Sequence, residues 1–187
     1  MIISITGGPG TGKTSVGKLL AKRLGFPFYS VGDLRGKMAL ERGITIDELN
    51  ARGETDASTD TVADDYQREL GQKEDNFVIE GRLSWHFIPH SFKVLLTCNV
   101  DEAARRIFEA SKANPDDRPD EPSYASVEDV KKAITDRVES DIRRYKKYYG
   151  IEYRDPAHYD FVLETAPIKG VEAVTDLVEE AVKKANA

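Results

Sequence analysis

Eight residues near the start of the chain, GGPGTGKT at positions 7–14, combine four glycines with a lysine and a threonine. They fit the pattern G-x-x-x-x-G-K-[ST], with an apolar run before it and an amphipathic stretch after it. Glycines accept positive φ and let the backbone approach a ligand closely, and successive N–H groups then form a pocket for an anion. We therefore predict that this loop wraps the phosphates of ATP. The predicted ATP-binding residues are Gly8, Pro9, Gly10, Thr11, Gly12, Lys13, Thr14 and Ser15.

Three side chains are expected to act on the bound triphosphate. Lys13 is predicted to be catalytic, because its amine can reach the β- and γ-phosphates from the start of a helix whose dipole also favours anions. The Thr14 hydroxyl is predicted to ligate Mg²⁺, the expected cofactor. In NFVIEGR an apolar run ends in Glu80, at a predicted strand end near the loop. Glu80 is therefore predicted to orient water bound to that Mg²⁺.

A second group of charges lies in DRVESDIRRYKKYYG, where Arg137, Asp141 and Arg144 are spaced i, i+4, i+7. This spacing puts them on one face of a helix, so Asp141 could hold both arginines. Phosphoryl transfer spreads negative charge over the transferred group, and fixed cations stabilise it. Arg137 and Arg144 are therefore candidate catalytic residues. An exposed salt-bridge ladder without any role in catalysis explains the spacing equally well.

These residues need elements to position them, and the apolar pattern supplies a regular set. Runs rich in apolar residues at 1–6, 27–31, 76–80, 93–98 and 160–164 predict five strands. Helical patterns are found at 13–24, 33–42, 58–70, 101–112 (with Asp101 as the expected N-cap), 127–149 and 170–185. Short strands that alternate with helices predict an α/β fold of three layers, a five-stranded parallel sheet with helices on both faces.

Two segments interrupt this alternation. Residues 43–72 are unusually polar and lie between the second and third strands, and residues 111–125 contain three prolines and Arg118. A polar insert beside a strand end and a proline-rich loop are typical of segments that close over a site. We predict one domain over residues 1–187, in which 43–72 binds the acceptor and 111–125 forms a lid loop.

Composition restricts the partners. The net charge of −6 with no long basic stretch argues against nucleic acid. The single cysteine, Cys98, excludes an intrachain disulfide and lies in an apolar run, so it is expected to be a core residue. No apolar run approaches the ~18 residues of a membrane span. We expect a cytoplasmic monomer that binds neither a membrane nor nucleic acid.

The order of these motifs resembles the nucleoside monophosphate kinase family, and within it most closely the short archaeal-type cytidylate kinases. The phosphate loop GGPGTGKT is shared with that family, and YSVGDLR resembles the start of its monophosphate-binding region. IEGRLSWHFIP resembles the acid-Gly-Arg stretch of the family. The pattern R-x-x-x-D-x-x-R at 137–144 resembles its lid-side arginines, and YDFVLETA resembles its final strand. The resemblance extends over nearly the whole chain.

The resemblance implies roles for further residues. Arg35, Arg82 and Asp141 would form the site for the acceptor's phosphate, although many members carry the first arginine one residue later, where this chain has Gly36. Arg137 and Arg144 would bridge donor and acceptor during transfer. Side chains that could contact the base or stack on it are Asp60, Asp64, Gln67, Trp85 and His86.

The implied reaction is transfer of the γ-phosphoryl group of ATP to CMP or dCMP with Mg²⁺. An adenylate or uridylate kinase remains an alternative, because the base depends on few side chains. A small-molecule kinase of the shikimate or gluconate type would use the same loop and sheet. From a different class, a nucleotide-binding regulatory protein would need the loop but no acceptor site. The absence of an N-K-x-D motif argues against a GTPase.

Overall fold

The computed structural model describes residues 1–56, 58–114 and 121–185 of the chain. Its described part contains one sheet of five strands, all parallel, in the order β2-β3-β1-β4-β5. The strands are β1 (Ile2–Gly7), β2 (Phe28–Ser30), β3 (Phe77–Glu80), β4 (Phe92–Thr97) and β5 (Phe161–Glu164). The predicted five-stranded parallel sheet is thus confirmed.

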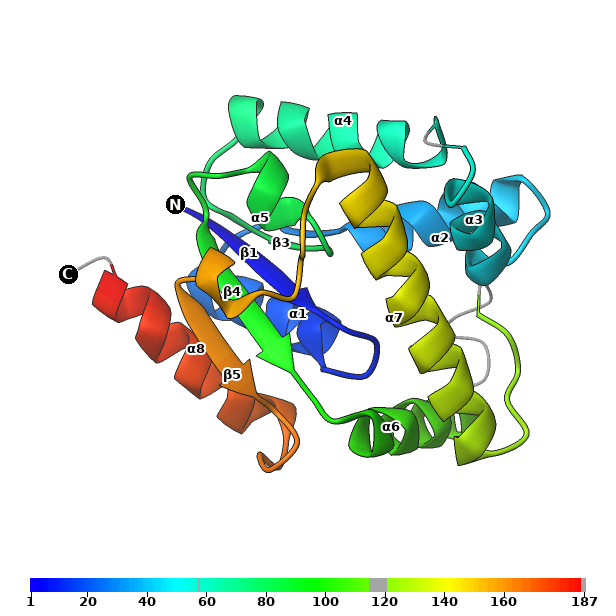
Figure 1. Cartoon of the computed structure of the whole chain (residues 1–187). Coiled ribbons are helices and arrows are strands. Elements are labelled where there is room, and N and C mark those ends of the chain that lie inside the picture. Colours follow the sequence, from blue (N-terminus) through cyan, green and yellow to red (C-terminus); the bar gives the residue numbers. More distant parts are fainter. Residues whose placement is uncertain (57, 115–120, 186–187) are drawn as a thin grey trace.

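Helices cover both faces of the sheet (Figure 1). Along the chain they are α1 (Lys13–Leu24), α2 (Val31–Glu41), α3 (Ile46–Gly53), α4 (Ser58–Lys73), α5 (Ser84–Phe87), α6 (Val100–Ala113), α7 (Val127–Tyr149), a 3₁₀ turn η1 (Pro156–His158) and α8 (Val171–Ala185). In Figure 1, α7 runs beside the sheet from α6 to α4 and α5, while α1 and α8 pack together on one face of the sheet. The α/β, three-layer prediction is therefore confirmed.

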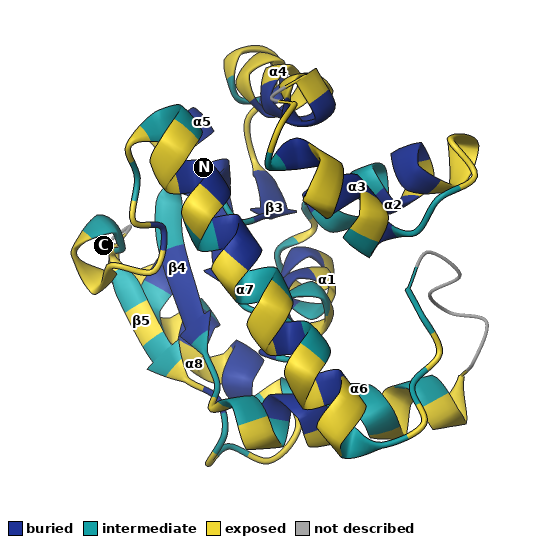
Figure 2. Ribbon diagram, turned by 45° about the vertical axis from the view of Figure 1, so that its right-hand side comes forward, coloured by how far each residue is buried: buried dark blue, intermediate teal, exposed yellow. Residues whose placement is uncertain are grey.

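Successive side chains of β1 point to opposite faces of the sheet, which explains why helices cover both faces. Ile3 and Ile5 pack into a core with α1 and α8, whereas Ile2 packs on the other side with residues of α4 and β3. β3 is buried at all of its positions, as Figure 2 shows by its dark blue ribbon. A strand that is buried on both faces needs a continuous apolar run, which is the pattern of FVI in this chain.

Glycines set several helix ends. α1 ends at Gly25 and α7 at Gly150, each in the left-handed conformation, with φ of 69° and 71°. Residues with a Cβ rarely adopt that conformation, so a glycine there ends a helix at a defined position. The predicted bounds of these two helices, 13–24 and 127–149, agree with the structure.

One helix was not predicted, and two predicted local features were wrong. The polar segment 43–72 contains α3, which starts with a capping box in which Thr45 and Glu48 exchange hydrogen bonds. The N-cap of α6 is Asn99, not Asp101, because the Asn99 side chain accepts a hydrogen bond from the Glu102 N–H. The same helix continues to Ala113, so residues 111–113 are helical and do not belong to the predicted lid loop. Arg118 lies outside the described residues.

Candidate active site

Parallel strands bring their carboxyl ends to one edge of the sheet. In the register of this sheet Ile5 pairs with Glu80, and Ser30 also pairs with Glu80. The phosphate loop, the start of α2 and the end of β3 therefore meet at that edge, where ligands bind in open α/β sheets. A cleft of about 1010 Å³ opens there, with α4, α6 and α7 forming its other walls.

The loop between β1 and α1 has the backbone that an anion pocket needs. Gly10 and Gly12 have φ of 73° and 86°. A Cβ on Gly10 would lie 2.7 Å from the carbonyl oxygen of Ala103, so the close contact with α6 also requires glycine. The first turn of α1 has no side-chain cap and no acidic residue. Its N–H groups and dipole consequently favour an anion in the cleft.

Most of the predicted ATP-binding residues line this cleft. They are Pro9, Gly10, Gly12, Lys13, Thr14 and Ser15. The other two support the loop from behind: the buried Thr11 hydroxyl donates to the Gly8 carbonyl over 2.9 Å, and the Thr165 hydroxyl contacts the Thr11 carbonyl at 3.2 Å. Gly8 and Thr11 therefore shape the pocket and are not part of its lining.

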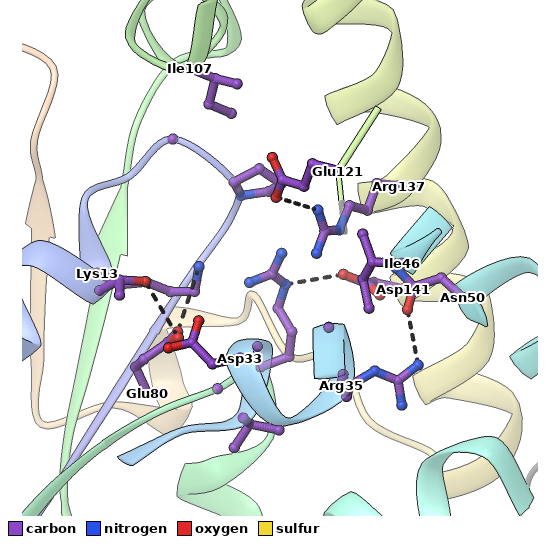
Figure 3. A pocket seen from close by; sticks show the side chains of 18 of the residues that line it. Lys13, Asp33, Arg35, Ile46, Asn50, Glu80, Ile107, Glu121, Arg137 and Asp141 are labelled. Carbon is purple, nitrogen blue, oxygen red and sulfur yellow. Dashed lines mark hydrogen bonds and ion pairs between the residues drawn. The ribbon is translucent and has the colours of Figure 1, made fainter. Parts of the chain in front are cut away.

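Lys13, Thr14 and Glu80 come together as the sequence predicts (Figure 3). The Lys13 ammonium lies 3.6 Å from one oxygen of Glu80, and the Thr14 hydroxyl lies 3.4 Å from the other. Ser30 also donates a hydrogen bond to Glu80, which is 2% exposed. Asp33, at the start of α2, lines the same part of the cleft. Sequence analysis missed Asp33, although its place just after β2 marks it as a strand-end carboxylate.

The side of the cleft formed by α2, α4 and α7 contains an ionic network in which cations and anions alternate. Arg35 donates to Asp60, whose other oxygen lies 3.1 Å from Nε of Arg144. Arg144 donates to Asp141 over 2.8 Å, and Asp141 accepts from Nε of Arg82 over 3.0 Å. Three arginines therefore share two carboxylates, which leaves the network with a net charge of +1. All five side chains line the cleft.

Contacts to neighbouring main-chain and amide oxygens hold the network in place. Arg82 donates to the Gly7 carbonyl over 2.7 Å, next to the phosphate loop. Asn50, on α3, accepts from Arg35 over 2.9 Å through its side chain and from Arg144 over 3.2 Å through its carbonyl. The network thus connects β1, α2, α3, α4 and α7, and sequence analysis did not identify Asn50 as a member.

Asp141 does not hold the pair of arginines predicted for it. It contacts Arg82 and Arg144, whereas Arg137 lies 3.5 Å from Glu121. The reason is that Arg82 approaches from the end of β3, a distant part of the sequence. Because the Asp141 and Arg144 side chains are only 4% and 1% exposed, the interpretation as an exposed salt-bridge ladder is wrong for this pair. Arg137 still lines the cleft, at 20% side-chain exposure (Figure 3).

Burial and charge act in opposite directions on this network. Burial alone would raise the pKa of Asp141, but the charges of Arg82 and Arg144 lower it below its ordinary value. Burial likewise would lower the pKa of Arg82, and the charge of Asp141 raises it above its ordinary value. Asp141 and Arg82 are therefore both charged at neutral pH. Asp141 is fit to position arginines but not to bind a phosphate itself, because both groups are anions.

Replacing Asp141 by asparagine is expected to lower the free energy of unfolding by about 3 kcal/mol or more at neutral pH, because the buried Arg144 and the partly buried Arg35 and Arg82 would then share one carboxylate. The folded pKa of Asp141 is depressed, so its contribution is present above the unfolded value of about 3.9 and is lost as pH falls through the folded value. Urea unfolding across this pH range should show that the difference in free energy of unfolding between wild type and variant becomes smaller as the pH falls. A difference in free energy of unfolding that does not change with pH would contradict a stabilising role for the Asp141 charge.

Asp60, Asp64 and Gln67 lie on one face of α4, are buried, and line the cleft. Asp64 accepts a hydrogen bond from the Tyr149 hydroxyl. Burial raises the pKa of Asp64, and the bond from Tyr149 opposes that shift. The structure thus places in the cleft all three α4 residues proposed to contact a base.

Trp85 and His86 lie outside the cleft lining. The Trp85 ring stacks on His158 at 4.5 Å between centroids, so it packs between α5 and the 3₁₀ turn η1. Cys98 is half-buried and packs beside the α6–α7 core, and burial raises the pKa of its thiol. Arg106 of α6 also lines the cleft and donates to the Thr165 carbonyl over 2.9 Å. Arg106 was not among the residues predicted from the sequence.

Among the described residues, no group of three or more His, Cys, Asp and Glu side chains could hold a metal ion by itself. In the same described part of the chain, no helix combines the length and the apolar character that crossing a bilayer requires.

Comparison with known proteins gives consistent matches. The model described as "Cytidylate kinase-like family" matches residues 2–167. The cytidylate kinase of Methanocella arvoryzae is 35% identical over 187 residues, which cover 99% of this chain and 100% of that protein. The S-adenosylmethionine-dependent nucleotide dehydratase of Lacinutrix mariniflava is 33% identical over 186 residues, or 99% of this chain and 36% of that protein.

Solved structures agree on the fold. A shikimate kinase from Bacteroides thetaiotaomicron superposes with a TM-score of 0.65 over 98% of both chains, at 17% identity. At this identity the similarity shows a shared P-loop kinase fold and carries no information about the acceptor.

Proposed function

The chain belongs to the cytidylate kinase-like family, and we propose that it transfers the γ-phosphoryl group of ATP to CMP or dCMP. It is an ATP-dependent phosphotransferase of the nucleoside monophosphate kinase type. The observation that supports the proposal most directly is the arginine-rich network that faces the phosphate loop across one cleft. Its net positive charge suits the phosphate of a second nucleotide.

ATP would occupy the side of the cleft formed by the loop and α6. Its phosphates would rest on the N–H groups at the start of α1, with Lys13 on the β- and γ-phosphates. Arg106 and the apolar Ile107 and Ala110 line the adjacent wall, which suits a planar base. This placement points the γ-phosphate toward α7 and its arginines.

Arg35 and Arg82 would hold the acceptor's phosphate. Their side chains are 11% and 12% exposed, and carboxylates and carbonyls fix both guanidinium groups before any ligand binds. Fixed donors of this kind bind an anion without further ordering of the side chains. Asp141 would position Arg82 and would not contact the phosphate.

Arg137 and Arg144 would then differ in role. Within the part of the chain that the structure describes, Arg137 has one ion pair, with Glu121 at the edge of the cleft, so it can turn to the transferred group. Arg144 contacts Asp60, Asp141, Asn50 and Tyr145. We therefore assign Arg137 to the transition state and Arg144 mainly to positioning the other arginines.

Positioning and charge neutralisation suffice for this reaction. The acceptor's phosphate has a second pKa of about 6, so it is already ionised at neutral pH and needs no general base. In-line attack then depends on holding two phosphates of like charge together, which cations in a closed cleft accomplish.

The residues present fit a Mg²⁺ ion. Mg²⁺ prefers oxygen ligands and commonly keeps several waters, with one or two carboxylates and substrate phosphates. Thr14, Glu80 and Asp33 offer such oxygens beside the phosphate loop. When bound, the ion would neutralise charge on the β- and γ-phosphates.

We further propose that residues 1–187 form one domain in which the 43–72 insert contributes the acceptor pocket. α3 and α4 provide Asn50, Asp60, Asp64 and Gln67 to the cleft lining, which supports this assignment. The lid predicted at 111–125 lies partly outside the described residues, and Glu121 to Tyr124 line the cleft.

The acceptor can be identified by measuring ADP release from Mg·ATP with CMP, dCMP, UMP, AMP, GMP, shikimate, gluconate or no acceptor. We expect CMP and dCMP to stimulate release most strongly. Stimulation by UMP or AMP alone would keep the proposed sites and correct the base. Stimulation by shikimate or gluconate alone, or ATP turnover that no acceptor affects, would contradict the proposal and favour a small-molecule kinase or a regulatory protein.

A further inference from the structure

The inner face of α4 carries three buried polar side chains, but only two of them remain for a ligand. Asp60 is engaged by Arg35 and Arg144 and belongs to the phosphate network. Asp64 and Gln67 follow one turn further along the helix and line the same cleft, at 8% and 2% exposure. Buried polar groups need hydrogen-bond partners, so a side chain in a cleft that uses only part of its hydrogen-bonding capacity within the protein can bind a polar ligand with the rest.

The Gln67 amide has a defined orientation. Its Oε1 accepts a hydrogen bond from the Ser84 hydroxyl over 2.8 Å, and its Nε2 donates to the Ala63 carbonyl over 3.0 Å. An amide nitrogen carries two hydrogens, so one N–H remains after these bonds. Gln67 therefore presents a donor, not an acceptor, to the cleft.

The Asp64 carboxylate is oriented in a similar way. Its Oδ2 accepts from the hydroxyl of Tyr149, in the last turn of α7. This bond leaves Oδ1 as an acceptor toward the cleft, since a carboxylate oxygen has two lone pairs and no hydrogen. Asp64 and Gln67 are spaced i, i+3 and so lie side by side on the helix.

We propose that Asp64 and Gln67 form the acceptor–donor pair that selects a pyrimidine with a 4-amino group, an inference that rests on the proposed nucleotide kinase function. A cytosine base has an amino donor at C4 next to an acceptor at N3. Uracil has the reverse, an acceptor at C4 and a donor at N3. Asp64 and Gln67 complement the first pattern and oppose the second.

The surroundings strengthen this discrimination. Val31, Ala63, Leu83 and Tyr145 also line the cleft and are buried, so the pair lies among apolar side chains. A site that pairs with a substrate's polar group rejects an analogue with mismatched groups, because the buried partners are then left unsatisfied. The phosphate arginines would bind both nucleotides equally, and only the α4 pair would tell them apart.

The test compares kcat/KM for CMP and UMP in wild type and in Asp64→Asn. With Tyr149 donating to its oxygen, the asparagine presents an amide N–H to the base, so UMP should gain and CMP lose. We expect the CMP-to-UMP ratio to fall at least ~10-fold. Asp65→Asn, an exposed neighbour that pairs with Arg68 on the surface, is the matched control and should keep the ratio.

The outcomes separate this inference from the proposed function. If wild type phosphorylates neither nucleotide, the function itself is contradicted. If wild type prefers CMP and folded Asp64→Asn keeps the same ratio, only the α4 assignment fails. A wild-type preference for UMP would overturn the assignment directly.

A second variant covers the case in which Asp64→Asn fails to fold. Tyr149→Phe removes the hydroxyl that orients Asp64, so we expect a higher KM for CMP and a lower CMP-to-UMP ratio, with kcat for CMP nearly unchanged. Calorimetric titration with CMP and with UMP, without ATP, gives the same comparison at equilibrium. Unchanged KM, ratio and affinities in this variant would overturn the proposal.

Discussion

Lys13→Ala is expected to lower turnover by at least ~10²-fold, because it removes a fixed cation from the charge that develops on the transferred phosphoryl group. The structure supports this size of effect, since the Lys13 side chain is only 16% exposed and Lys13 is the first residue of α1, directly after the phosphate loop. A cation in such a shielded site interacts with phosphate more strongly than one in water. Initial rates with saturating Mg·ATP and CMP measure the loss.

The fold should survive this substitution. Glu80, the partner of Lys13, also accepts hydrogen bonds from Thr14 and Ser30. Lys22→Ala is the matched control, because Lys22 is an exposed lysine in the last turn of the same helix. Near-wild-type turnover in Lys13→Ala, or an equal loss of turnover in Lys22→Ala, would contradict a role for Lys13 of the phosphate loop in catalysis.

The phosphate loop was predictable because its chemistry is local. Eight consecutive residues determine the backbone, the helix start and the lysine, so the pattern in GGPGTGKT carries over directly to the geometry around Lys13. Glu80 was predictable for a related reason, since the carboxyl ends of parallel strands share one edge of the sheet. Local patterns also give the bounds of α1 and α7, where glycines end the helices.

The arginine network was not predictable in the same way, because its contacts join distant segments. Asp141 meets Arg82 across 59 positions of sequence, and Asp60 bridges Arg35 and Arg144. Helix geometry places Arg137 and Arg144 on one face but does not specify which of several arginines reaches the carboxylate. α3 is a different case: the Thr45–Glu48 capping box was visible in the sequence and was outweighed by the polarity of the segment.

Arg137→Ala and Arg144→Ala are expected to separate catalysis from structure. For Arg137→Ala we expect a loss in kcat of ~10³-fold, within the range found for arginines that stabilise a phosphoryl-transfer transition state. Its stability should change little, because its ion pair with Glu121 is 3.5 Å long and lies where both side chains are 20% exposed. A partly exposed pair of that kind contributes about 1 kcal/mol or less.

Arg144→Ala should behave differently. The Arg144 side chain is 1% exposed and pairs with two buried carboxylates, Asp60 and Asp141. Removing it leaves both anions with fewer partners in a buried site, which typically costs about 3–5 kcal/mol. Activity should also fall, because Arg35 and Arg82 would no longer be held by a complete network. We therefore expect a clear fall in melting temperature together with a higher KM for the monophosphate.

Arg143→Ala provides the control, since Arg143 is on the same helix, is 58% exposed, and pairs with Glu54 and Glu139 on the surface. It should keep both kcat and the melting temperature. Thermal unfolding and steady-state kinetics on all three variants then show, for each arginine separately, whether it contributes to catalysis, to stability or to neither. Should Arg137→Ala lower the melting temperature and spare kcat, Arg137 would be a structural residue. The positive charge that stabilises the transferred group would then have to come from other cations of the cleft lining, among them Lys13, Arg35 and Arg82.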